Sequence, residues 1–408
     1  MRMKKRISIV LALVLLASAL PLSVTPVAAY EKKIPCDADG NNELTKEELV
    51  NAILPYMLGE GDLKLDDVGD AAWVYAYWGG KPKTIVDSAD RTVTIYKPVK
   101  RIAMMNGDCM PIMRAIHATD KIVAVNKYTI QDEILYPEFS DYPNIGSVWS
   151  PNYEALLAAK PDTVILYGTI FKKKCTDIEN KLKEVAPDVT TIWLDGYKPG
   201  LTPKPGAQLI EESRELGYLL DREEEAEEWI GFYEGIMDSI TEKVGGIENK
   251  TRVYLECWKT WYTAGPDAGW GEKLKISGGE NIFSDISGYK NIDPGAVLYR
   301  NPEAIIWIEK TKGGYDTGDL TELSSIRDEI MERLNTTTAA KNGKVFIINT
   351  DVFGGTEHFI GIAYVAKWLY PANFTDLKPE IIHKQYLTEF QRLSDSLVDN
   401  GVFVYPGV

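Results

Sequence analysis

The stretch Asn152-Tyr-Glu-Ala-Leu-Leu-Ala-Ala-Lys-Pro-Asp-Thr-Val-Ile165 is the best guide to the fold, because this chain contains the pattern twice. It returns without gaps, 141 residues later, as Asp293-Pro-Gly-Ala-Val-Leu-Tyr-Arg-Asn-Pro-Glu-Ala-Ile-Ile306. Each copy predicts a short helix, a proline that ends it, and a buried β-strand. A repeated helix-to-strand unit predicts two similar α/β lobes. The cleft between two such lobes is a usual place for a small ligand.

Predicted strands and helices alternate along most of the chain. After a hairpin that begins at Thr84, the first lobe has strands at 101–105, 121–125, 163–167 and 190–194, with helices at 108–118, 152–160 and 175–186. The second lobe has strands at 252–257, 304–308 and 344–348, with helices at 269–277, 293–300 and 323–334, and further helices from His358 to about Val398. Such alternation indicates parallel sheets covered by helices on both faces. We therefore place two Rossmann-like α/β lobes at residues 84–205 and 250–408.

A helical connection, residues 206–246, is predicted between the lobes. The apolar residues of its second half recur at alternating steps of four and three: Ala226, Ile230, Tyr233, Met237, Ile240 and Val244. This spacing places them on one face of a helix about 33 Å long, at about 1.5 Å per residue. One long helix is stiff, so we expect a cleft that closes little when a ligand binds.

The first 29 residues have the pattern of a secretory signal peptide. A basic segment, Met1–Arg6, precedes an apolar segment at 7–22, and Val27-Ala-Ala29 offers a small-residue cleavage site. An uncleaved membrane anchor is the alternative, since the apolar run approaches the length of a spanning helix. Export would place the protein at the outer face of the cell membrane, in a periplasm or at the cell surface. No lipobox cysteine follows the apolar segment, so the mode of attachment stays open.

The chain is acidic, with a formal net charge of −15 at pH 7 that becomes −19 when the four basic residues of the signal peptide are removed. Such a charge is expected to repel nucleic acid and anionic lipid surfaces. The spacing of the cysteines matches no zinc motif and is compatible with one or two disulfides, which the sequence cannot pair. These residues are Cys36, Cys109, Cys175 and Cys257.

Residues 37–48, Asp-Ala-Asp-Gly-Asn-Asn-Glu-Leu-Thr-Lys-Glu-Glu, predict a calcium-binding loop. Calcium takes roughly six to eight oxygen ligands, and this spacing would wrap them around one ion with Glu48 bidentate. Asn42 replaces the usual glycine at position six and tolerates a left-handed backbone. The alternative is an acidic turn before a helix. The predicted ligands fall at loop positions 1, 3, 5, 7, 9 and 12: Asp37, Asp39, Asn41, Glu43, Thr45 and Glu48.

Two helices are predicted around and after this loop, at Glu47–Leu58 and Leu65–Trp78, and no second complete set of ligands follows. The arrangement resembles EF-hand and dockerin-like modules, so we place a small all-α calcium module at residues 30–80. Calcium is the expected cofactor, in a structural or docking role. Its removal would take away the folding free energy that the ion contributes.

Four stretches, in this order along the chain, carry a further resemblance. They are Val86–Ile95, the Asn152–Ile165 unit, Ser277–Asp285 and Gly361–Pro371. Over about residues 84–395 the chain resembles the class III substrate-binding proteins of ABC importers, the group that binds ferric siderophores, cobalamin and haem. The resemblance implies a non-enzymatic extracytoplasmic monomer. It would capture a metal chelate, foremost a ferric siderophore, in the cleft between the lobes and deliver it to an ABC permease and its ATPase.

The resemblance also assigns docking residues. In that family an exposed glutamate on each lobe meets arginines of the permease, and Glu154 occupies the position in the first lobe. The matching position in the second lobe is Gly295, which has no side chain. Either Asp293, two residues away, substitutes for the glutamate, or the docking is lopsided.

Ligand-binding residues are expected in the loops that follow the carboxyl ends of the strands, because open α/β sheets bind ligands there. The aromatic residues among them suit a large, flat or apolar ligand such as a corrin, a porphyrin or an aryl chelator, and the alternative is that some of them pack the lobe. The first lobe offers Asn106, Asp108, Cys109, Lys127, Tyr128 and Tyr167. The second offers Trp258, Trp261, Tyr262, Trp270, Lys312 and His358.

Some of these side chains suit a metal complex directly. His358 and Cys109 could be axial ligands, and Tyr262 could face ferric iron. Lys127 and Lys312, with Lys259, could neutralise a carboxylate-bearing siderophore. The alternatives are a capping or surface role for the histidine and simple solvation of the lysines.

Two other functional classes compete with a binding protein. An enzyme finds little support, because no Ser-His-Asp set, Walker loop or HExxH motif is visible and two of the three histidines, His117 and His383, are predicted in helices. A surface adhesion or scaffold protein would use the calcium module as its active part. The cargo stays open among an iron chelate, cobalamin, haem and another metal complex.

Overall fold

A four-stranded sheet forms the centre of the N-terminal lobe. The computed structural model describes residues 32–60, 62–196 and 204–407, so the predicted signal peptide at 1–29 lies outside the described residues. The strands run parallel in the order β4-β3-β7-β8. They are apolar runs with few exposed positions, as expected for strands covered on both faces. Their bounds are Ile102–Met104 (β3), Ile122–Val125 (β4), Thr163–Tyr167 (β7) and Thr190–Leu194 (β8).

Short helices and turns connect these strands. The predicted helix at 108–118 is shorter in the structure, because the chain turns after α4 and His117 takes a left-handed backbone with φ 57°. His117 therefore lies in a turn, and its prediction in a helix was wrong. The helical elements are Gly107–Cys109, α4 (Met110–Ala115), Thr119–Lys121, α5 (Lys127–Gln131), Pro137–Phe139, α6 (Tyr153–Ala158) and α7 (Lys172–Val185); a small hairpin pairs β5 (Gly146–Ser147) with β6 (Ser150–Pro151).

The C-terminal lobe contains a five-stranded sheet in the order β11-β9-β13-β14-β15. The first four strands are parallel, and β15 pairs with β14 in the antiparallel direction. The sequence predicted helices to about Val398 and no final strand, so β15 corrects that prediction. The strands are Arg252–Cys257 (β9), Glu280–Asn281 (β11), Ala304–Glu309 (β13), Val345–Asn349 (β14) and Val404–Tyr405 (β15), and a separate hairpin joins Tyr262–Ala264 (β10) to Tyr289–Asn291 (β12). The helices of this lobe are Gly269–Ile276 (α10), Pro294–Arg300 (α11), Thr321–Arg333 (α12), Thr338–Lys341 (α13) and Thr350–Phe353 (α14).

The repeat seen in the sequence is also a repeat in structure. The Asn152 side chain caps α6 by accepting a bond from the Ala155 amide at 3.1 Å, and Asp293 caps α11 through the Ala296 amide at 3.2 Å. After each helix the chain passes through a left-handed residue, Lys160 with φ 47° or Asn301 with φ 44°. A proline and a buried strand, β7 or β13, follow in each lobe. The predicted helix-proline-strand unit is confirmed in both copies.

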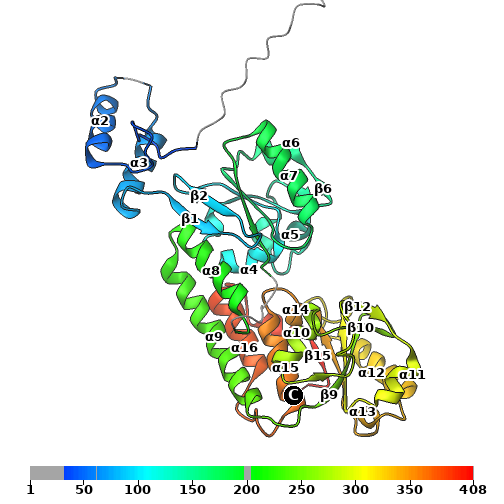
Figure 1. Ribbon diagram of the computed structural model, residues 1–408. Helices are drawn as coiled ribbons and strands as arrows, with labels where there is room; N and C mark the ends of the chain where they lie inside the picture. Colours follow the sequence, from blue (N-terminus) through cyan, green and yellow to red (C-terminus); the bar gives the residue numbers. More distant parts are fainter. Residues whose placement is uncertain (1–31, 61, 197–203, 408) are drawn as a thin grey trace, which may run out of the picture. The chain divides into compact units, whose positions relative to one another are not determined.

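Two helices, α8 (Ala207–Leu220) and α9 (Glu223–Gly245), form the connection between the lobes. The two helices lie side by side (Figure 1). They are joined at Asp221, which has a left-handed backbone. At 23 residues, α9 is about 34 Å long. All six residues of the predicted apolar face are buried, together with Trp229, whose ring packs against Phe359 and Phe390.

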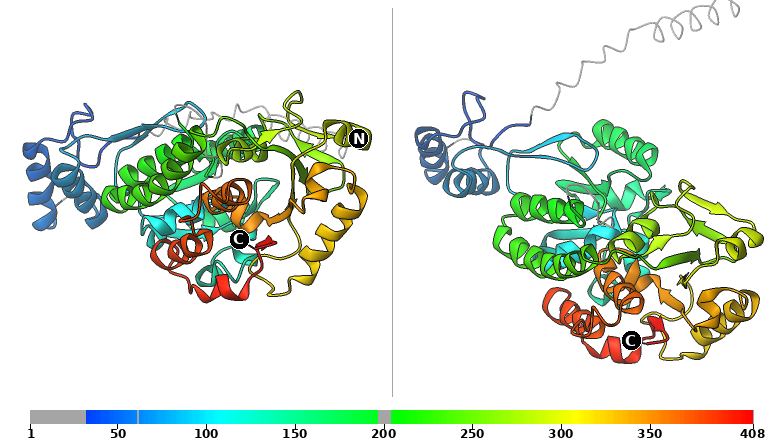
Figure 2. Two further views of the ribbon diagram at one scale, coloured as in Figure 1. Left: turned by 90° about the horizontal axis from the view of Figure 1, so that it is seen from below. Right: turned by 60° about the horizontal axis from the view of Figure 1, so that its bottom comes forward.

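The C-terminal helices pack on α9. Figure 2 shows the orange α15 (His358–Leu369) against the green α9, and most of α15 is buried. The chain continues through α16 (Pro379–Gln385), a π-helical turn at Tyr386–Phe390 and α17 (Ser396–Asn400). Within the described residues, no helix has the length and apolar character needed to cross a membrane.

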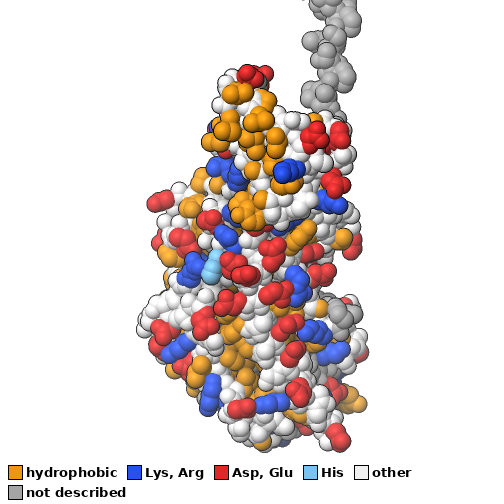
Figure 3. Space-filling model, turned by 90° about the vertical axis from the view of Figure 1, so that its left-hand side faces the viewer, with side chains coloured by type: hydrophobic (Ala, Val, Ile, Leu, Met, Phe, Trp, Pro, Cys, Tyr) orange, Lys and Arg blue, Asp and Glu red, His pale blue; other side chains and the backbone are white. Residues whose placement is uncertain are grey.

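Two helices, α2 (Lys46–Met57) and α3 (Leu65–Tyr77), form a small N-terminal module before the hairpin of β1 (Lys83–Val86) and β2 (Thr92–Ile95). The helices enclose a core that includes Leu49, Ala71 and Val74. Other large hydrophobic side chains of this module are exposed, and Figure 3 shows them gathered at the top of that view. They include Leu54, Met57, Leu58, Leu65 and Tyr77.

Candidate binding cleft

A pocket of about 310 Å³ lies between the two lobes, at the carboxyl ends of their parallel strands. The N-terminal lobe supplies its lining from the segments after β3, β4 and β7. The C-terminal lobe supplies Thr350 and Asp351 from α14 and the loop before α15. The lining residues are Gly107, Asp108, Pro111, Asn126, Tyr128, Thr129, Asp132, Leu135, Tyr136, Tyr167, Thr350, Asp351, Gly355, Thr356 and Glu357. The pocket is therefore where the strand-end rule predicted it.

Two buried asparagines shape the loops of the N-terminal side. The Asn106 side chain accepts a bond from the Asp108 amide at 2.9 Å and donates to the Leu194 carbonyl at 2.6 Å. Asn126 accepts from the Tyr128 and Thr129 amides at 2.9 and 3.1 Å, which caps α5. Because Asn106 is fully buried and its amide bonds within the protein, it positions Asp108. Asn106 is not among the lining residues, and its direct contact with a ligand stays a prediction.

Burial raises the pKa of Asp132, and it raises the pKa values of three further carboxyl groups of the pocket to about 6 or 7. Burial raises the pKa of Asp108 to about 6, against the opposing effect of Lys273. Burial also raises the pKa of Asp351 to about 6, with a bond from the Tyr315 amide lowering it and Asp132 raising it further. For Glu357, burial raises the pKa to about 7, although the Tyr386 hydroxyl donates to it at 2.9 Å. These three carboxyls therefore change charge near neutral pH.

Hydrogen bonds join the lobes beside the pocket. The Thr356 hydroxyl lies 3.0 Å from the Asp108 carbonyl and 2.8 Å from the Gly196 carbonyl. The Gln391 side-chain amide donates to the Pro111 carbonyl at 3.1 Å. Both donors come from the C-terminal part of the chain, and all three acceptor carbonyls belong to the N-terminal lobe. These bonds tie the two lobes together beside the pocket.

Three of the predicted residues line the pocket as expected, namely Asp108, Tyr128 and Tyr167. Tyr128 is 54% exposed, whereas burial raises the pKa of Tyr167. Lys127 lies with its ammonium 4.8 Å from the Tyr128 ring centroid and is not among the lining residues. Lys312 is exposed and also lies outside the lining.

His358 and Cys109 are buried in the interior and do not line the pocket, so direct ligation of a cargo by either side chain stays a prediction. The His358 Nε2 lies 2.8 Å from the Tyr233 hydroxyl and its Nδ1 lies 2.8 Å from the Gly355 carbonyl. Burial lowers the pKa of this histidine to about 3. The Cys109 thiol is fully buried, and burial raises its pKa well above the ordinary value. Neither side chain is exposed in this structure.

The aromatic residues of the C-terminal lobe separate into three groups. Trp258, Tyr262 and Tyr289 pack together with ring centroids 5.6 to 6.0 Å apart, and the Lys310 ammonium lies 3.5 Å from the Trp258 centroid. Trp270 packs on Phe353 at 5.5 Å. Trp261 packs on a buried cluster that includes Tyr254 and Ile305, with Arg333 over its ring, and its contact with a cargo stays a prediction. Cargo contact by Trp258, Tyr262 and Trp270 stays a prediction.

The sequence missed several residues that line the pocket. Asp351 lies two residues after the end of β14, so the strand-end rule that selected Tyr167 would have selected it too. Thr356 and Glu357 lie in the loop from which only His358 was chosen. Asp132 and Tyr136 follow α5, and no strand ends near them in the sequence, so no signal there indicated a place in the pocket.

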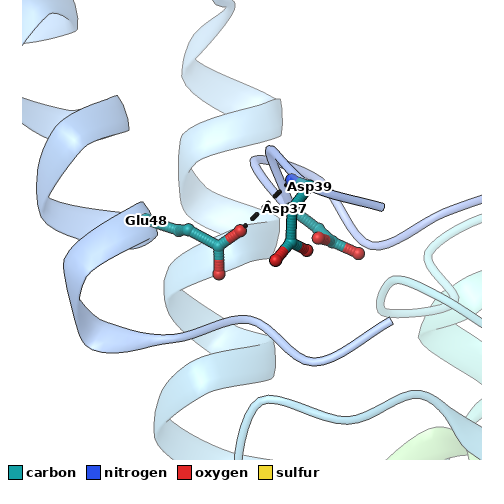
Figure 4. Close-up of side chains that lie close together, drawn as sticks. All are labelled: Asp37, Asp39 and Glu48. Carbon is teal, nitrogen blue, oxygen red and sulfur yellow. Dashed lines mark hydrogen bonds between the residues drawn. The ribbon is translucent and has the colours of Figure 1, made fainter. Parts of the chain in front are cut away.

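The loop before α2 gathers three of its predicted ligands (Figure 4). One carboxylate oxygen each of Asp37, Asp39 and Glu48 lies within 4.8 Å of the others. Asp37 is buried and accepts bonds from the Gly40 and Asn42 amides at 2.9 and 2.8 Å, and Asn42 has the expected left-handed backbone with φ 61°.

The remaining predicted ligands of the loop have partners within the protein. Thr45 caps α2 and donates to Glu48 at 2.7 Å, and bonds from Thr45 lower the pKa of that carboxyl. Glu43 lies 3.6 Å from the Lys81 ammonium. Asn41 accepts a bond from the Glu43 amide at 2.7 Å. The donor set is of the oxygen type that calcium takes.

The two predicted docking positions are exposed in equivalent helices. Glu154 lies in the first turn of α6, and Asp293 is the capping residue of α11. Gly295, the repeat partner of Glu154, is exposed as well.

Known proteins share the sequence pattern and the fold of this chain. Residues 102–352, more than half of the chain, match the periplasmic binding protein family. The chain belongs to that family. This periplasmic binding protein is 23% identical over 302 residues to the uncharacterized ABC transporter substrate-binding lipoprotein YvrC of Bacillus subtilis, which covers 72% of this chain and 88% of YvrC. It is 23% identical over 354 residues to the molybdate-binding protein MolA of Haemophilus influenzae, covering 76% of this chain and 92% of MolA.

A solved structure supports the same fold. The TroA-like periplasmic binding protein FepB of Veillonella parvula has a TM-score of 0.68 and 22% identity, covering 79% of this chain and 99% of FepB. This periplasmic binding protein is thus a substrate-binding protein of an ABC transporter with a two-lobed α/β fold. Proteins of this kind are non-enzymatic carriers that bind a small ligand and pair with a permease and its ATPase.

Proposed function

We propose that this periplasmic binding protein captures a metal complex in the pocket between its lobes, with an iron chelate as the first candidate. The observation that supports this function is the meeting of oxygen-bearing side chains from both lobes in one pocket. Asp108 and Tyr167 come from the N-terminal lobe, and Asp351 and Glu357 come from the C-terminal lobe. Carboxylate and phenol oxygens are donors that suit hard metal ions.

Other metal complexes are alternative cargoes. The packed rings of Trp258, Tyr262 and Tyr289 favour a flat ligand such as haem or a corrin, because aromatic faces pack on such ligands. The similarity to MolA makes molybdate a further candidate.

A titration of the mature chain, residues 30–408, tests the function. Tryptophan fluorescence would be followed as ferric siderophores, cobalamin, haem and molybdate are added, with metal content measured on the protein as purified. We expect saturable binding of one metal complex at about micromolar affinity or tighter, as for a specific small-molecule site. Binding of none of them, with no metal carried through purification, would contradict the function.

Delivery requires contact with the permease, and we assign it to Glu154 on α6 and Asp293 on α11. Both are exposed acidic residues at the start of equivalent helices. Acidic residues in these places complement basic residues of a partner. The protein would act as an exported monomeric carrier rather than as an enzyme, with its predicted signal peptide removed.

We also propose that the loop at 37–48 binds calcium in a structural role. The clustered carboxylates of Asp37, Asp39 and Glu48 support this assignment. An ion there would tie the loop to the start of α2 and stabilise the helix pair. Calcium-dependent docking of a protein partner is the second candidate role, favoured by the exposed apolar side chains of α2 and α3.

Thermal unfolding of the mature chain in calcium and in a chelator tests this site. Calcium should raise the midpoint by several degrees, because an ion that binds only the folded state stabilises it. Asp37→Asn and Glu48→Gln should abolish the rise, whereas Asp66→Asn on the exposed start of α3 should retain it. A midpoint that does not respond to calcium in the unchanged protein would contradict the site.

A further inference from the structure

The lining of the pocket is strongly acidic. Asp108 and Asp132 come from the N-terminal lobe, and Asp351 and Glu357 come from the C-terminal lobe. None of the lining residues in the described parts of the chain is a lysine or an arginine. The polar lining otherwise consists of tyrosine and threonine hydroxyls and the Asn126 amide.

Carboxyl groups of the two lobes act on each other across the pocket. Asp132 contributes to the raised pKa of Asp351, and Asp108 contributes to that of Glu357. Ionised carboxyl groups that interact in this way repel one another when no ligand is present. A cation between them would replace that repulsion with attraction to both lobes, and an anion would add to it.

Nearby basic groups are engaged elsewhere. The buried Lys273 ammonium donates to the Phe353 carbonyl at 2.8 Å, and burial lowers its pKa to about 7. Arg114 is buried and bonds the Leu135 carbonyl at 2.7 Å and Glu138 at 2.6 Å. Lys127 lies over the Tyr128 ring. Lys273 acts on Asp108, and Arg114 acts on Asp132. Four carboxyl groups of the lining therefore face two basic groups, neither of which lines the pocket.

We infer that the cargo of this cleft is a small, positively charged metal complex, held between carboxylates of the two lobes. The inference rests on the proposed function and narrows it. It disfavours oxyanions and the carboxylate-bearing siderophores that Lys127 and Lys312 were expected to neutralise. The pocket volume of about 310 Å³ lies at the lower end of the range for small-molecule sites, which agrees with a compact ligand.

The charge of the pocket gives its binding a pH dependence. Asp108 and Asp351, with pKa values of about 6, and Glu357, with a pKa of about 7, are protonated in acid and ionised above neutral pH. Other groups also affect these pKa values. Asp195 and Lys273 act on the pKa of Asp108, and Asp132 and Asp316 act on that of Asp351. The Tyr386 hydroxyl acts on the pKa of Glu357. A cation binds the ionised form, so its affinity rises with pH through this range and protons are released on binding.

Calorimetric titration with two complexes of one metal tests the inference. Hexaamminecobalt(III) is a compact trivalent cation whose N–H groups can donate to carboxylates. Hexacyanocobaltate(III) has the same metal and octahedral geometry with a trivalent negative charge. The mature chain should bind the cation at least about tenfold more tightly than the anion, with affinity rising about tenfold between about pH 5 and pH 8.

Variants identify the carboxyls that matter. Asp108→Asn and Asp351→Asn should each weaken cation binding about tenfold, because each removes one charge-assisted contact. Asp188→Asn, on an exposed loop between α7 and β8, should leave it unchanged. Circular dichroism checks folding, and Asp132→Asn replaces Asp108→Asn if that variant does not fold.

The outcomes distinguish a failure of the inference about the cargo's charge from a failure of the proposed binding function. Equal binding of the two cobalt complexes, or tighter binding of the anion, would overturn the inference and leave a binding protein in place. The inference would also be overturned if the protein bound a neutral or anionic ferric chelate but did not bind hexaamminecobalt(III). If neither the cobalt complexes nor a ferric chelate binds, the inference and the proposed function both fail.

Discussion

The two lobes repeat one unit of structure and differ in what that unit exposes. Asn152 and Asp293 cap equivalent helices, and Lys160 and Asn301 share a left-handed backbone before equivalent prolines. The exposed second helical position is Glu154 in one lobe and Gly295 in the other. The comparison shows that the two copies share the structural roles of the capping residue, the left-handed residue and the proline, whereas the exposed position after the first helical residue differs.

Equivalent core residues should produce the largest effects. Ile165 of β7 and Ile306 of β13 are matched in the repeat and fully buried. Ile165→Ala and Ile306→Ala should each reduce the free energy of unfolding by about 2–5 kcal/mol, through lost burial and a residual cavity. Denaturant titration of both variants measures this. A loss in one lobe alone would show that the two cores are not equivalent.

Exposed positions should matter for transport and not for cargo binding. Glu154→Ala should reduce uptake in a reconstituted transport assay about tenfold while the affinity for cargo stays unchanged, because a charge pair with the permease is lost. Asp293→Asn keeps the cap acceptor and removes the charge, so it tests whether Asp293 replaces the missing glutamate. Asp188→Asn is the control. Undiminished uptake by Glu154→Ala would remove its docking role, and an effect of Glu154 alone would make docking lopsided.

The helix caps should have smaller and equal effects. Asn152→Ala and Asp293→Ala each remove the side chain that accepts from the third residue of the helix. Each should reduce the free energy of unfolding by about 1 kcal/mol. Denaturant titration of the two variants side by side provides the comparison. Unequal losses would mean that one helix depends on contacts outside the repeated unit.

Glycine substitutions at the two left-handed residues should change the stability of the protein in opposite directions, and these changes should be the smallest. Lys160→Gly should stabilise the protein by about 0.5–1 kcal/mol, because glycine adopts a left-handed backbone without strain. Asn301→Gly relieves little strain and loses the bonds between its side chain and Thr338 at 2.8 and 3.0 Å, so it should destabilise. Thermal unfolding measures both. Stabilisation by both substitutions would show that backbone strain outweighs the Asn301 contacts.

Local pattern was enough to locate most of the secondary structure. The strands predicted at 163–167, 190–194 and 252–257 have the same bounds in the structure, because each is an apolar run bounded by turn residues. The helices α2 and α3 begin and end within one residue of the prediction. The final strand β15 was missed because a two-residue strand carries no periodicity, and it exists only by pairing with β14.

Site residues were harder to predict. The strand-end rule found Asp108, Tyr128 and Tyr167, but it could not tell which loop residues point into the cleft. His358 follows a strand and a short helix, as a ligand residue would. It is nevertheless buried, and its ring bonds the hydroxyl of Tyr233, which lies 125 residues earlier on α9. Cys109 and Asn106 are likewise buried by elements distant in the sequence.

The sequence by itself determined the two-lobed α/β architecture, the helical connection and the loop that gathers Asp37, Asp39 and Glu48, since each depends on residues close together in the chain. Only the tertiary structure decided the sign of the charge that lines the cleft. The loops that follow the strands contain both lysines and carboxylates. In the folded protein Lys127 lies over the Tyr128 ring, whereas Asp108, Asp132, Asp351 and Glu357 line the pocket. Lys273, on α10, donates to the Phe353 carbonyl. Charge in a binding site depends on side-chain direction, and that direction is fixed by neighbours from distant parts of the chain.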